Sequence, residues 1–469
     1  VLDLMATQNL KNVLIVPRGA KGGFVLRHEP ADPTRRRQQA EKMYEEFIRG
    51  LLDVTDNRVG DTVVQPKRVI RWDAPDDYLV VAPDKGTAHL SDTANAIAAE
   101  RGFWLEDAFA SGGSRGYDHK KEAITARGAW ECVKRHFREM GADPERDAIR
   151  VAGVGDMSGD VFGNGMLLSR SMQLIAAFDH RHIFIDPNPD PELSYQAREQ
   201  LFHAGRTTWE DYPSEAISAG GGVYPRGAKA IRLQREAKAA LGIDDEVISG
   251  QDLVKAVLRA PVDLLWNGGI GTYIKSSRES HLDVGDPAND SVRVNADEVR
   301  CRVLGEGGNL GVTSEGRIQL SENGVRLNSD AVDNSGGVDM SDHEVNLKVL
   351  FARPRQEGRI SGEERDAILE SIRDQISRKV LCNNWVQSRT LSLDELRSRR
   401  DPARFYRAIS FLSERVPFNR KELSLPGERL IRQRMSHGQG LYRPELAALM
   451  SAAKIDLSPE LGHSDLFAL

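Results

Sequence analysis

The sequence predicts an α/β protein that ends in a helical region, and two observations support this fold class. Short apolar runs alternate with helical segments through most of the first 340 residues, which is typical of a parallel sheet with crossover helices. From His343 onward strand signals vanish and the pattern is helical. We expect an α/β domain at residues 1–148, a Rossmann-type doubly wound domain at residues 149–340, and a helical C-terminal region at residues 341–469.

The first domain contains candidate strands at residues 12–16 and 78–82, both short apolar runs followed by proline. The spacing of apolar residues predicts a helix at residues 34–52. Ser91 is a candidate N-cap for a second helix. A long helix is expected at residues 121–140.

The second domain opens with a strand, a glycine turn and a helix. The strand at residues 149–154 runs through Gly155 and Ser158 into an apolar helix at residues 161–168. Glycines suit this turn because its backbone angles are costly for other residues, and because a phosphate must approach bare backbone. The helix N-terminus then offers N–H groups and partial positive charge to a pyrophosphate.

A second apolar strand ends in Asp179, about twenty residues after the turn, where an acid accepts hydrogen bonds from a ribose diol. The pattern departs from G-x-G-x-x-G because Ser158 holds the third glycine position and Gly159 follows one place late. The structural alternative is an ordinary tight strand-to-helix connection. Strand, turn, helix and acid together favour dinucleotide binding.

Further elements complete the second domain. A helix at residues 251–259 and strands at residues 262–266 and 301–304 are expected. The first of these strands runs into Asn267-Gly-Gly-Ile-Gly271, and the second ends in a glycine-rich stretch that contains Asn309. This alternation favours a parallel sheet.

Bulk composition excludes several classes of protein. The 469 residues carry a formal net charge of -6, so no bulk charge attracts nucleic acid or an anionic membrane. No run approaches the roughly eighteen apolar residues of a membrane span. Three widely separated cysteines lack metal-ligand spacing and indicate a reducing, cytoplasmic compartment. Because the sequence starts at Val1, we expect a piece of a longer polypeptide.

Two polar residues at predicted strand ends are candidates for proton chemistry. Lys21 lies between glycines after the first strand, and an ammonium in a tight, partly desolvated loop has a lowered pKa and can shuttle a proton. Asp84 follows the second strand and can act as a general acid/base. The structural alternatives are a surface lysine and a turn aspartate that caps backbone N–H groups.

A glycine turn also precedes the helical region. Ser341 and Glu344 have the spacing of a capping box, so local helix capping is the favoured interpretation on pattern alone. A hydroxyl at this place can also meet a ligand. The histidines lack the spacing of a metal site, and no metal is predicted.

Together these motifs resemble the glutamate dehydrogenase superfamily, and in particular its large bacterial NAD-dependent members. Residues 17–23 are similar to the active-site lysine motif, and residues 82–84 to the motif of the catalytic aspartate. Three further stretches, at residues 125–128, 306–309 and 334–341, are similar to other superfamily motifs. The five motifs occur in one order over most of residues 10–350.

The resemblance implies NAD-dependent oxidative deamination of L-glutamate to 2-oxoglutarate and ammonia by a homo-oligomer. Lys21 would activate the water or carbonyl at the substrate α-carbon, Asp84 would relay protons, and Ser341 would contact the distal carboxylate. NAD is assigned to Thr125, Gly153, Gly155, Asp156, Met157, Ser158, Asp179, Asn309 and Asn334.

One departure from the superfamily pattern is the lack of a second substrate-binding cation before Val13. The first domain is therefore expected to be a partial substrate domain, and the 469-residue chain alone is expected to bind NADH but to turn over glutamate feebly or not at all. One alternative is an amino-acid dehydrogenase for leucine, valine or phenylalanine, whose pocket needs no such cation. The other is a non-catalytic NAD-binding module, which would need neither Lys21 nor Asp84.

Overall fold

The computed structural model describes residues 25–72, 74–82, 88–416, 420–421 and 423–462. These residues form two compact units. The larger unit contains Ala123–Gly336 and the described chain from Val380 onward, and the smaller contains the described chain up to Glu122 together with Gly337–Lys379. The domain boundaries at residues 148 and 340 stay predictions, because compactness alone does not define a folding domain. The candidate strand at residues 12–16 lies outside the described residues.

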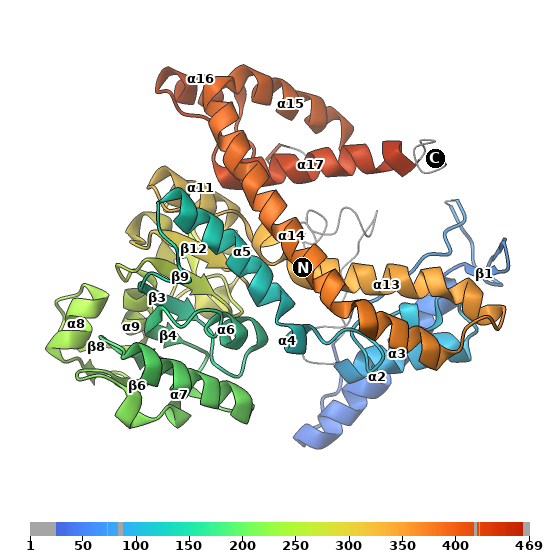
Figure 1. Cartoon of the computed structure of the whole chain (residues 1–469), viewed down its shortest axis with the longest axis horizontal. Helices are drawn as coiled ribbons and strands as arrows, with labels where there is room; N and C mark the ends of the chain where they lie inside the picture. Colours follow the sequence, from blue (N-terminus) through green and yellow to red (C-terminus); the bar gives the residue numbers. More distant parts are fainter. Residues whose placement is uncertain (1–24, 73, 83–87, 417–419, 422, 463–469) are drawn as a thin grey trace. The chain divides into compact units, whose positions relative to one another are not determined.

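A six-stranded mixed sheet forms the centre of the larger unit (Figure 1). Its order is β12 (Val303–Glu306), β9 (Leu264–Asn267), β3 (Ile149–Val154), β4 (Met172–Phe178), β5 (His182–Ile185) and β6 (Gly222–Pro225). The first four strands are parallel, as the sequence pattern predicts. The last two run antiparallel and are absent from the sequence prediction.

The parallel arrangement that the sequence pattern favours does not extend to this edge, and the cause is a short connection. Asp179 donates its N–H to the His182 carbonyl (3.0 Å), so β4 turns directly into β5. A turn of this length has no room for a crossover helix, and only an antiparallel neighbour can follow it.

Short helices and strands connect the sheet. The helices are α5 (Ile124–Glu139), α6 (Asp160–Gly165), α7 (Pro191–Ala204), α8 (Arg235–Leu241), α9 (Gly250–Leu258), α10 (His281–Val284), α11 (Ser314–Glu322) and α12 (Asp330–Asp333). The accessory strands are β7 (Ile231–Arg232), β8 (Val247–Ile248), β10 (Ile274–Lys275) and β11 (Val294–Asn295). The helix predicted at residues 161–168 is thus shorter than expected.

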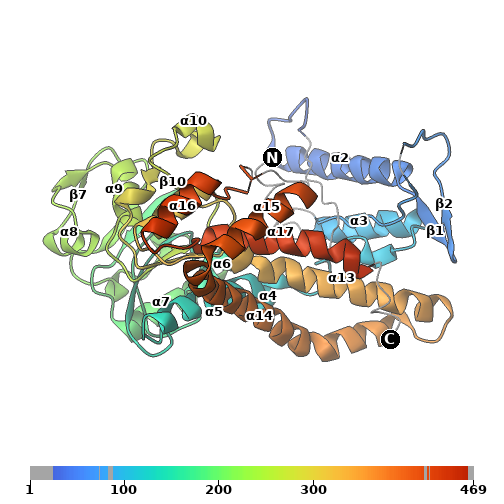
Figure 2. The same ribbon diagram turned by 90° about the horizontal axis from the view of Figure 1, so that it is seen from above.

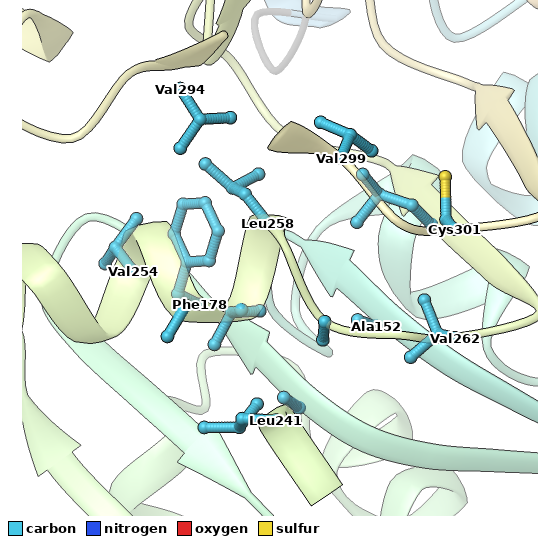
Figure 3. Packing of buried hydrophobic residues seen from close by; sticks show 14 of the residues in the cluster. Ala152, Phe178, Leu241, Val254, Leu258, Val262, Val294, Val299 and Cys301 are labelled. Atoms are coloured by element: carbon cyan, nitrogen blue, oxygen red, sulfur yellow. The ribbon is translucent and has the colours of Figure 1, made fainter. Parts of the chain in front are cut away.

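Helices cover both faces of the sheet, which confirms the doubly wound class. Val151 of β3 points into one core, with α5, α6 and α7, while the next residue, Ala152, points into the other, with α8 and α9. This alternation is the two-residue period of a strand. Figure 3 shows the second core, where Phe178 of β4 lies beside Val254 and Leu258 of α9.

The chain changes its direction of winding at β3. It moves from β3 to β4 on one side and returns later to β9 on the other. The register places Val154 opposite Asn267, so both strands end at one level. In open α/β sheets, ligands bind beyond the carboxyl ends of the strands at such a switch point. The turn after β3 and the loop after β9 therefore mark the candidate site.

The smaller unit combines helices with one hairpin. The part up to Glu122 contains α2 (Pro33–Val54), β1 (Asn57–Val59), β2 (Thr62–Val64), α3 (Ala88–Glu100) and α4 (His119–Glu122), and the stretch Gly337–Lys379 adds parts of two later helices. The helix predicted at residues 34–52 is confirmed by α2. Ile48 of α2, Ile97 of α3 and Phe109 share its buried core.

Two local predictions for this part of the chain are wrong, and a third holds only in part. Residues 78–82 contain an isolated bridge from Val81 to Ala110 instead of a strand. Ser91 lies inside α3 and is buried, so it does not cap the helix. The helix expected at residues 121–140 is interrupted at Ala123, whose φ of 52° is left-handed.

The C-terminal part of the described chain is helical, as predicted. Its helices are α13 (Ser335–Gln356), α14 (Gly362–Arg400), α15 (Pro402–Arg415), α16 (Glu428–Ser436) and α17 (Arg443–Gly462). The last three lie together in the larger unit (Figure 2) and share a buried core. Among the helices in the described ranges, none has the length and apolar character needed to cross a bilayer.

A buried polar network joins β12 to the helices that follow it. Arg317 of α11 donates two hydrogen bonds to Glu306, both 2.8 Å long, and lies 3.2 Å from a carboxylate oxygen of Asp330. Asp333 accepts a hydrogen bond from the Glu306 N–H (3.0 Å). All four side chains are buried, so the ion pairs and the strand end are fixed together.

The C-terminal helices extend this network. Arg443 of α17 donates to Asn328 (2.9 Å), which in turn donates to Asp333 (2.8 Å). Burial raises the pKa of Asp333 to about 6 and the pKa of Glu306 to about 7, although the neighbouring hydrogen-bond donors oppose both shifts. The helical region therefore supports the strand end at which the candidate site lies.

The raised pKa of Glu306 predicts a pH dependence of stability. The folded chain binds this proton more tightly, because the pKa is about 7 when folded against a model value of 4.5. The stabilising contribution is present below pH 4.5 and is lost as the pH rises to about 7. Glu306→Gln cannot titrate, so its thermal midpoint should fall less between about pH 5 and about pH 7 than that of the parent.

Glu315→Gln removes an exposed acid from the same helix as Arg317 and is the matched control, expected to follow the parent. Thermal unfolding monitored by tryptophan fluorescence measures all three proteins. Equal pH dependence in the parent and Glu306→Gln would contradict the assignment of this proton to Glu306.

Candidate functional site

Glycines at the end of β3 allow α6 to pack directly on the strand. Gly155 has a φ of 137°, which side chains rarely adopt. A Cβ at Gly153 would lie 2.7 Å from the Phe162 ring, and one at Gly155 would lie 2.6 Å from the Phe162 Cβ. The turn therefore requires both glycines for packing, and the same bare backbone is accessible to a phosphate in a nucleotide-binding turn.

The carboxylate of Asp156 accepts hydrogen bonds from the next residues of the same turn. Its Oδ1 accepts hydrogen bonds from the Ser158 N–H (2.8 Å), the Ser158 hydroxyl (2.5 Å) and the Gly159 N–H (3.1 Å). These backbone donors precede α6, where a pyrophosphate would bind. The Met157 side chain is buried in the core below the turn and contributes packing.

Asp179 follows β4 at the strand end next to the glycine turn. The Gly155 N–H donates to the Phe178 carbonyl (2.8 Å), which holds the two segments together. Oδ1 of Asp179 accepts from the N–H groups of Arg181 (2.7 Å) and His182 (2.6 Å). Oδ1 thus accepts the hydrogen bonds that hold the β4–β5 turn. Oδ2 is the oxygen placed to accept a hydrogen bond from a ribose hydroxyl.

Arg226 is a neighbour of Asp179 that the sequence analysis missed. Its guanidinium donates to the Asp179 carbonyl (3.0 Å) and lies over the rings of Phe178 and Tyr273, 5.8 and 6.0 Å from their centroids. It therefore links the acid to the segment that follows β9. An arginine between Pro225 and Gly227 carries no motif that would have revealed this contact.

Two asparagines assigned from the resemblance meet beyond β12. Asn334 Nδ2 donates to Asn309 Oδ1 (2.8 Å), while the buried Oδ1 of Asn334 has no hydrogen-bond partner among the described residues. Thr125 is buried in the first turn of α5. A Cβ at Gly336 would lie 2.8 Å from the Ile124 carbonyl, so the turns that carry Thr125 and Asn334 are in close contact.

A third amide at this edge, Asn267, is also missing from the sequence prediction. It ends β9, is 5% exposed, and neither polar atom of its side chain has a partner within the described part of the chain. A Cβ at Gly311 would overlap its Nδ2. A buried amide without hydrogen bonds is costly, so Asn267 is a candidate ligand group. The sequence signal that could have indicated Asn267 was an asparagine followed by two glycines, directly after a predicted strand.

Ser341 belongs to the smaller unit, on α13. Its hydroxyl donates to the Gly337 carbonyl one turn earlier (3.2 Å). Burial raises the pKa of the neighbouring Asp342 to about 7, and the charge of Asp339 adds to the shift. The helix face beside Ser341 thus holds a carboxyl group that is partly protonated near neutral pH.

The predicted capping box is wrong because α13 begins at Ser335, ahead of Ser341. Glu344 is buried and accepts from the Tyr117 N–H (2.8 Å) and from Lys348 (2.9 Å). The sequence spacing was right for a cap, but the helix starts earlier than the capping interpretation assumes.

The candidate catalytic residues Lys21 and Asp84 lie outside the described residues. Their roles stay predictions from the motifs. Within the ranges that the structure describes, no group of three or more His, Cys, Asp or Glu side chains is arranged to hold a metal ion.

The chain matches a family model described as bacterial NAD-glutamate dehydrogenase, catalytic domain, over residues 1–394. The NAD-specific glutamate dehydrogenase of Pseudomonas aeruginosa is 52% identical over 463 residues, which cover 98% of this chain and 29% of that protein. The enzyme of the same name from Mycobacterium tuberculosis is 50% identical over 488 residues, covering 100% of this chain and 30% of that protein. The chain thus spans less than a third of the length of these relatives.

Among solved structures, the hetero-hexameric glutamate dehydrogenase from Thermus thermophilus is similar with a TM-score of 0.50 at 14% identity, over 98% of this chain and 78% of that chain. This likeness supports the α/β fold. The family match extends over residues 1–394, well beyond half of the sequence. The chain therefore belongs to the bacterial NAD-glutamate dehydrogenase family, in its catalytic domain.

Proposed function

We propose that the protein catalyses the NAD-dependent oxidative deamination of L-glutamate to 2-oxoglutarate and ammonia, and that this chain carries the catalytic part. The main support is the arrangement at one sheet edge: an acid after β4, a glycine turn after β3, and amides after β9 and β12. That order suits an extended dinucleotide, and the chain belongs to a family described by this activity.

The residues at the sheet edge fit NAD in three places. The glycine turn at residues 153–159 would hold the pyrophosphate. Oδ2 of Asp179 would accept from the adenosine ribose. The side-chain amide of Asn267 and Oδ1 of Asn334, which are buried without hydrogen-bond partners among the described residues, would contact the nicotinamide or its ribose, together with Asn309 and Thr125.

The substrate residues follow from the motifs. When bound, NAD would supply the hydride acceptor: Cα of glutamate would lose a hydride and its amino group a proton, and water would hydrolyse the resulting imine to 2-oxoglutarate and ammonia. Lys21 would polarise the carbon centre that water attacks, and Asp84 would relay the protons. Ser341 would donate its hydroxyl to the distal carboxylate.

We also infer that the protein acts in the cytoplasm. Cys132 and Cys301 are buried, Cys382 is exposed, and all three are free, which is typical of a reducing compartment. The homo-oligomeric state implied by the resemblance stays a prediction.

The experiment that tests this function is a turnover assay of the full-length enzyme. It should oxidise L-glutamate with NAD in strong preference to L-leucine, L-valine and L-phenylalanine. Lys21→Ala should lower turnover by several orders of magnitude and leave NADH affinity nearly intact, because the lysine acts at the substrate. Lys42→Ala, which removes an exposed lysine of α2, is the control. Near-normal turnover in Lys21→Ala would remove its catalytic role.

Asp179 should make the protein prefer NAD to NADP. Its carboxylate would face the 2′-phosphate of NADP, and like charges repel strongly in a partly desolvated site. Asp179→Asn keeps an oxygen for the β4–β5 turn and should narrow the affinity gap between NADH and NADPH by about tenfold. Fluorescence titration measures both affinities. Asp186→Asn, at the end of β5, controls for the loss of a buried acid. Equal affinities of the parent for both cofactors would contradict this role.

Asp156 was assigned to NAD from the resemblance, but its charge should weaken cofactor binding in the present sequence. Its carboxylate occupies the Ser158 and Gly159 N–H groups, and its charge would repel a pyrophosphate at short range. Asp156→Asn keeps the acceptor oxygen without the charge and should tighten NADH binding about tenfold. Asp190→Asn, an equivalent cap on α7, should leave the affinity unchanged. Weaker binding by Asp156→Asn would show instead that the cofactor needs this carboxylate.

A further inference from the structure

Leu310 has an unusual backbone conformation beside the candidate nicotinamide site. It follows Asn309 directly, and its φ of 58° lies in the left-handed region. Residues with a Cβ enter this region at an energetic cost, and such strain persists only where the surroundings enforce it. The next residue, Gly311, packs against Asn267. The strained residue therefore lies between two amides assigned to the cofactor.

A buried acid binds the backbone at this residue. The Leu310 N–H donates to Oδ2 of Asp330 (2.8 Å), and Oδ1 of Asp330 accepts from the Ala331 N–H (2.8 Å). Asp330 is 2% exposed. Both carboxylate oxygens are thus engaged by backbone donors, one of them on the strained loop.

Arg317 fixes Asp330 in turn. Its guanidinium lies 3.2 Å from Asp330 Oδ2 and forms two hydrogen bonds with Glu306, both 2.8 Å long. Glu306 ends β12, three residues before Asn309. The loop is therefore anchored at its start through Glu306 and at its end through Asp330, by one arginine.

The same helical turn also holds the amide pair. The Asn334 N–H donates to the Asp330 carbonyl (3.0 Å), and the Asn334 side chain donates to Asn309 (2.8 Å). Asp330 and Asn334 are therefore held in fixed positions relative to each other.

We propose that Asp330, held by Arg317, is a positioning residue that keeps Leu310 left-handed and thereby fixes the Asn309 amide for the nicotinamide end of the cofactor. The proposal rests on the NAD site described above and names the groups that set its geometry. Asp330 is not proposed to contact the cofactor. Any effect of Asp330 on cofactor binding must therefore pass through the backbone conformation of Leu310.

The test compares two ligands and a rescue in the 469-residue chain. Asp330→Ala should weaken NADH binding about tenfold and leave ADP-ribose, which lacks the nicotinamide, within about twofold of the parent. Glycine adopts the left-handed conformation freely. In the Leu310→Gly background the same Asp330→Ala change should therefore alter NADH affinity by less than about threefold.

A second variant keeps the test independent of whether Asp330→Ala folds. Leu310→Val leaves every acid in place but introduces a β-branched residue, which disfavours positive φ more strongly. It should weaken NADH binding and spare ADP-ribose, whereas Leu310→Gly should match the parent. Asp186→Ala, another buried acid in the same unit, is the control and should change neither affinity.

Different results would contradict the positioning role of Asp330 and the NAD site on which it rests. An equal loss of NADH affinity on Asp330→Ala with and without Leu310→Gly would overturn the proposal, as would parent-like NADH affinity in Leu310→Val. A parent chain that binds neither NADH nor ADP-ribose would instead contradict the NAD site itself.

Discussion

The close contact between Phe162 and the end of β3 is the constraint on which the rest of the larger unit depends. Gly153 and Gly155 provide no Cβ, so the Phe162 ring lies where side-chain atoms would otherwise be. Gly268, after β9, approaches Phe162 as closely: a Cβ there would lie 2.8 Å from its Cα. The helix therefore starts directly above the sheet, and glycines leave the backbone at both strand ends without side-chain atoms at the switch point.

The two halves of the proposed cofactor site are stabilised differently. On the adenosine side, the carboxylates of Asp156 and Asp179 satisfy backbone donors in their own turns. On the nicotinamide side, amides face the site and the charges are buried behind them, paired with Arg317. Buried ion pairs add little net stability but fix geometry when every partner is present. This matches a site that must orient a reacting ring more closely than a distal adenosine.

Local sequence patterns predicted the features that depend on local chemistry. The strand, glycine turn and acid around β3 and β4 were located correctly because they depend on residues that are close together in the sequence. The apolar runs and the glycines of this stretch can be read directly from it. β5 and β6 were missed because an antiparallel edge depends on the length of one turn. The isolated bridge at Val81 replaces a predicted strand for a related reason, since apolar runs alone do not determine whether a pairing partner is present.

The sequence patterns did not predict contacts between residues that are far apart in the sequence. Asn267 became a candidate only when its burial and missing partners were known. The Arg317–Asp330 pair and the strained Leu310 likewise depend on segments that meet in three dimensions. The assignment of Ser341 as a helix cap failed because α13 begins at Ser335, so the serine lies inside the helix.

A structure of the chain with NADH bound would show whether the cofactor lies along the carboxyl ends of the parallel strands. We expect the pyrophosphate at the glycine turn of residues 153–159, the adenosine ribose within hydrogen-bond distance of Asp179, and the nicotinamide beside Asn309 and Asn334. A dinucleotide bound away from the carboxyl ends of β3 and β9, or bound in the reverse direction along them, would contradict this expectation.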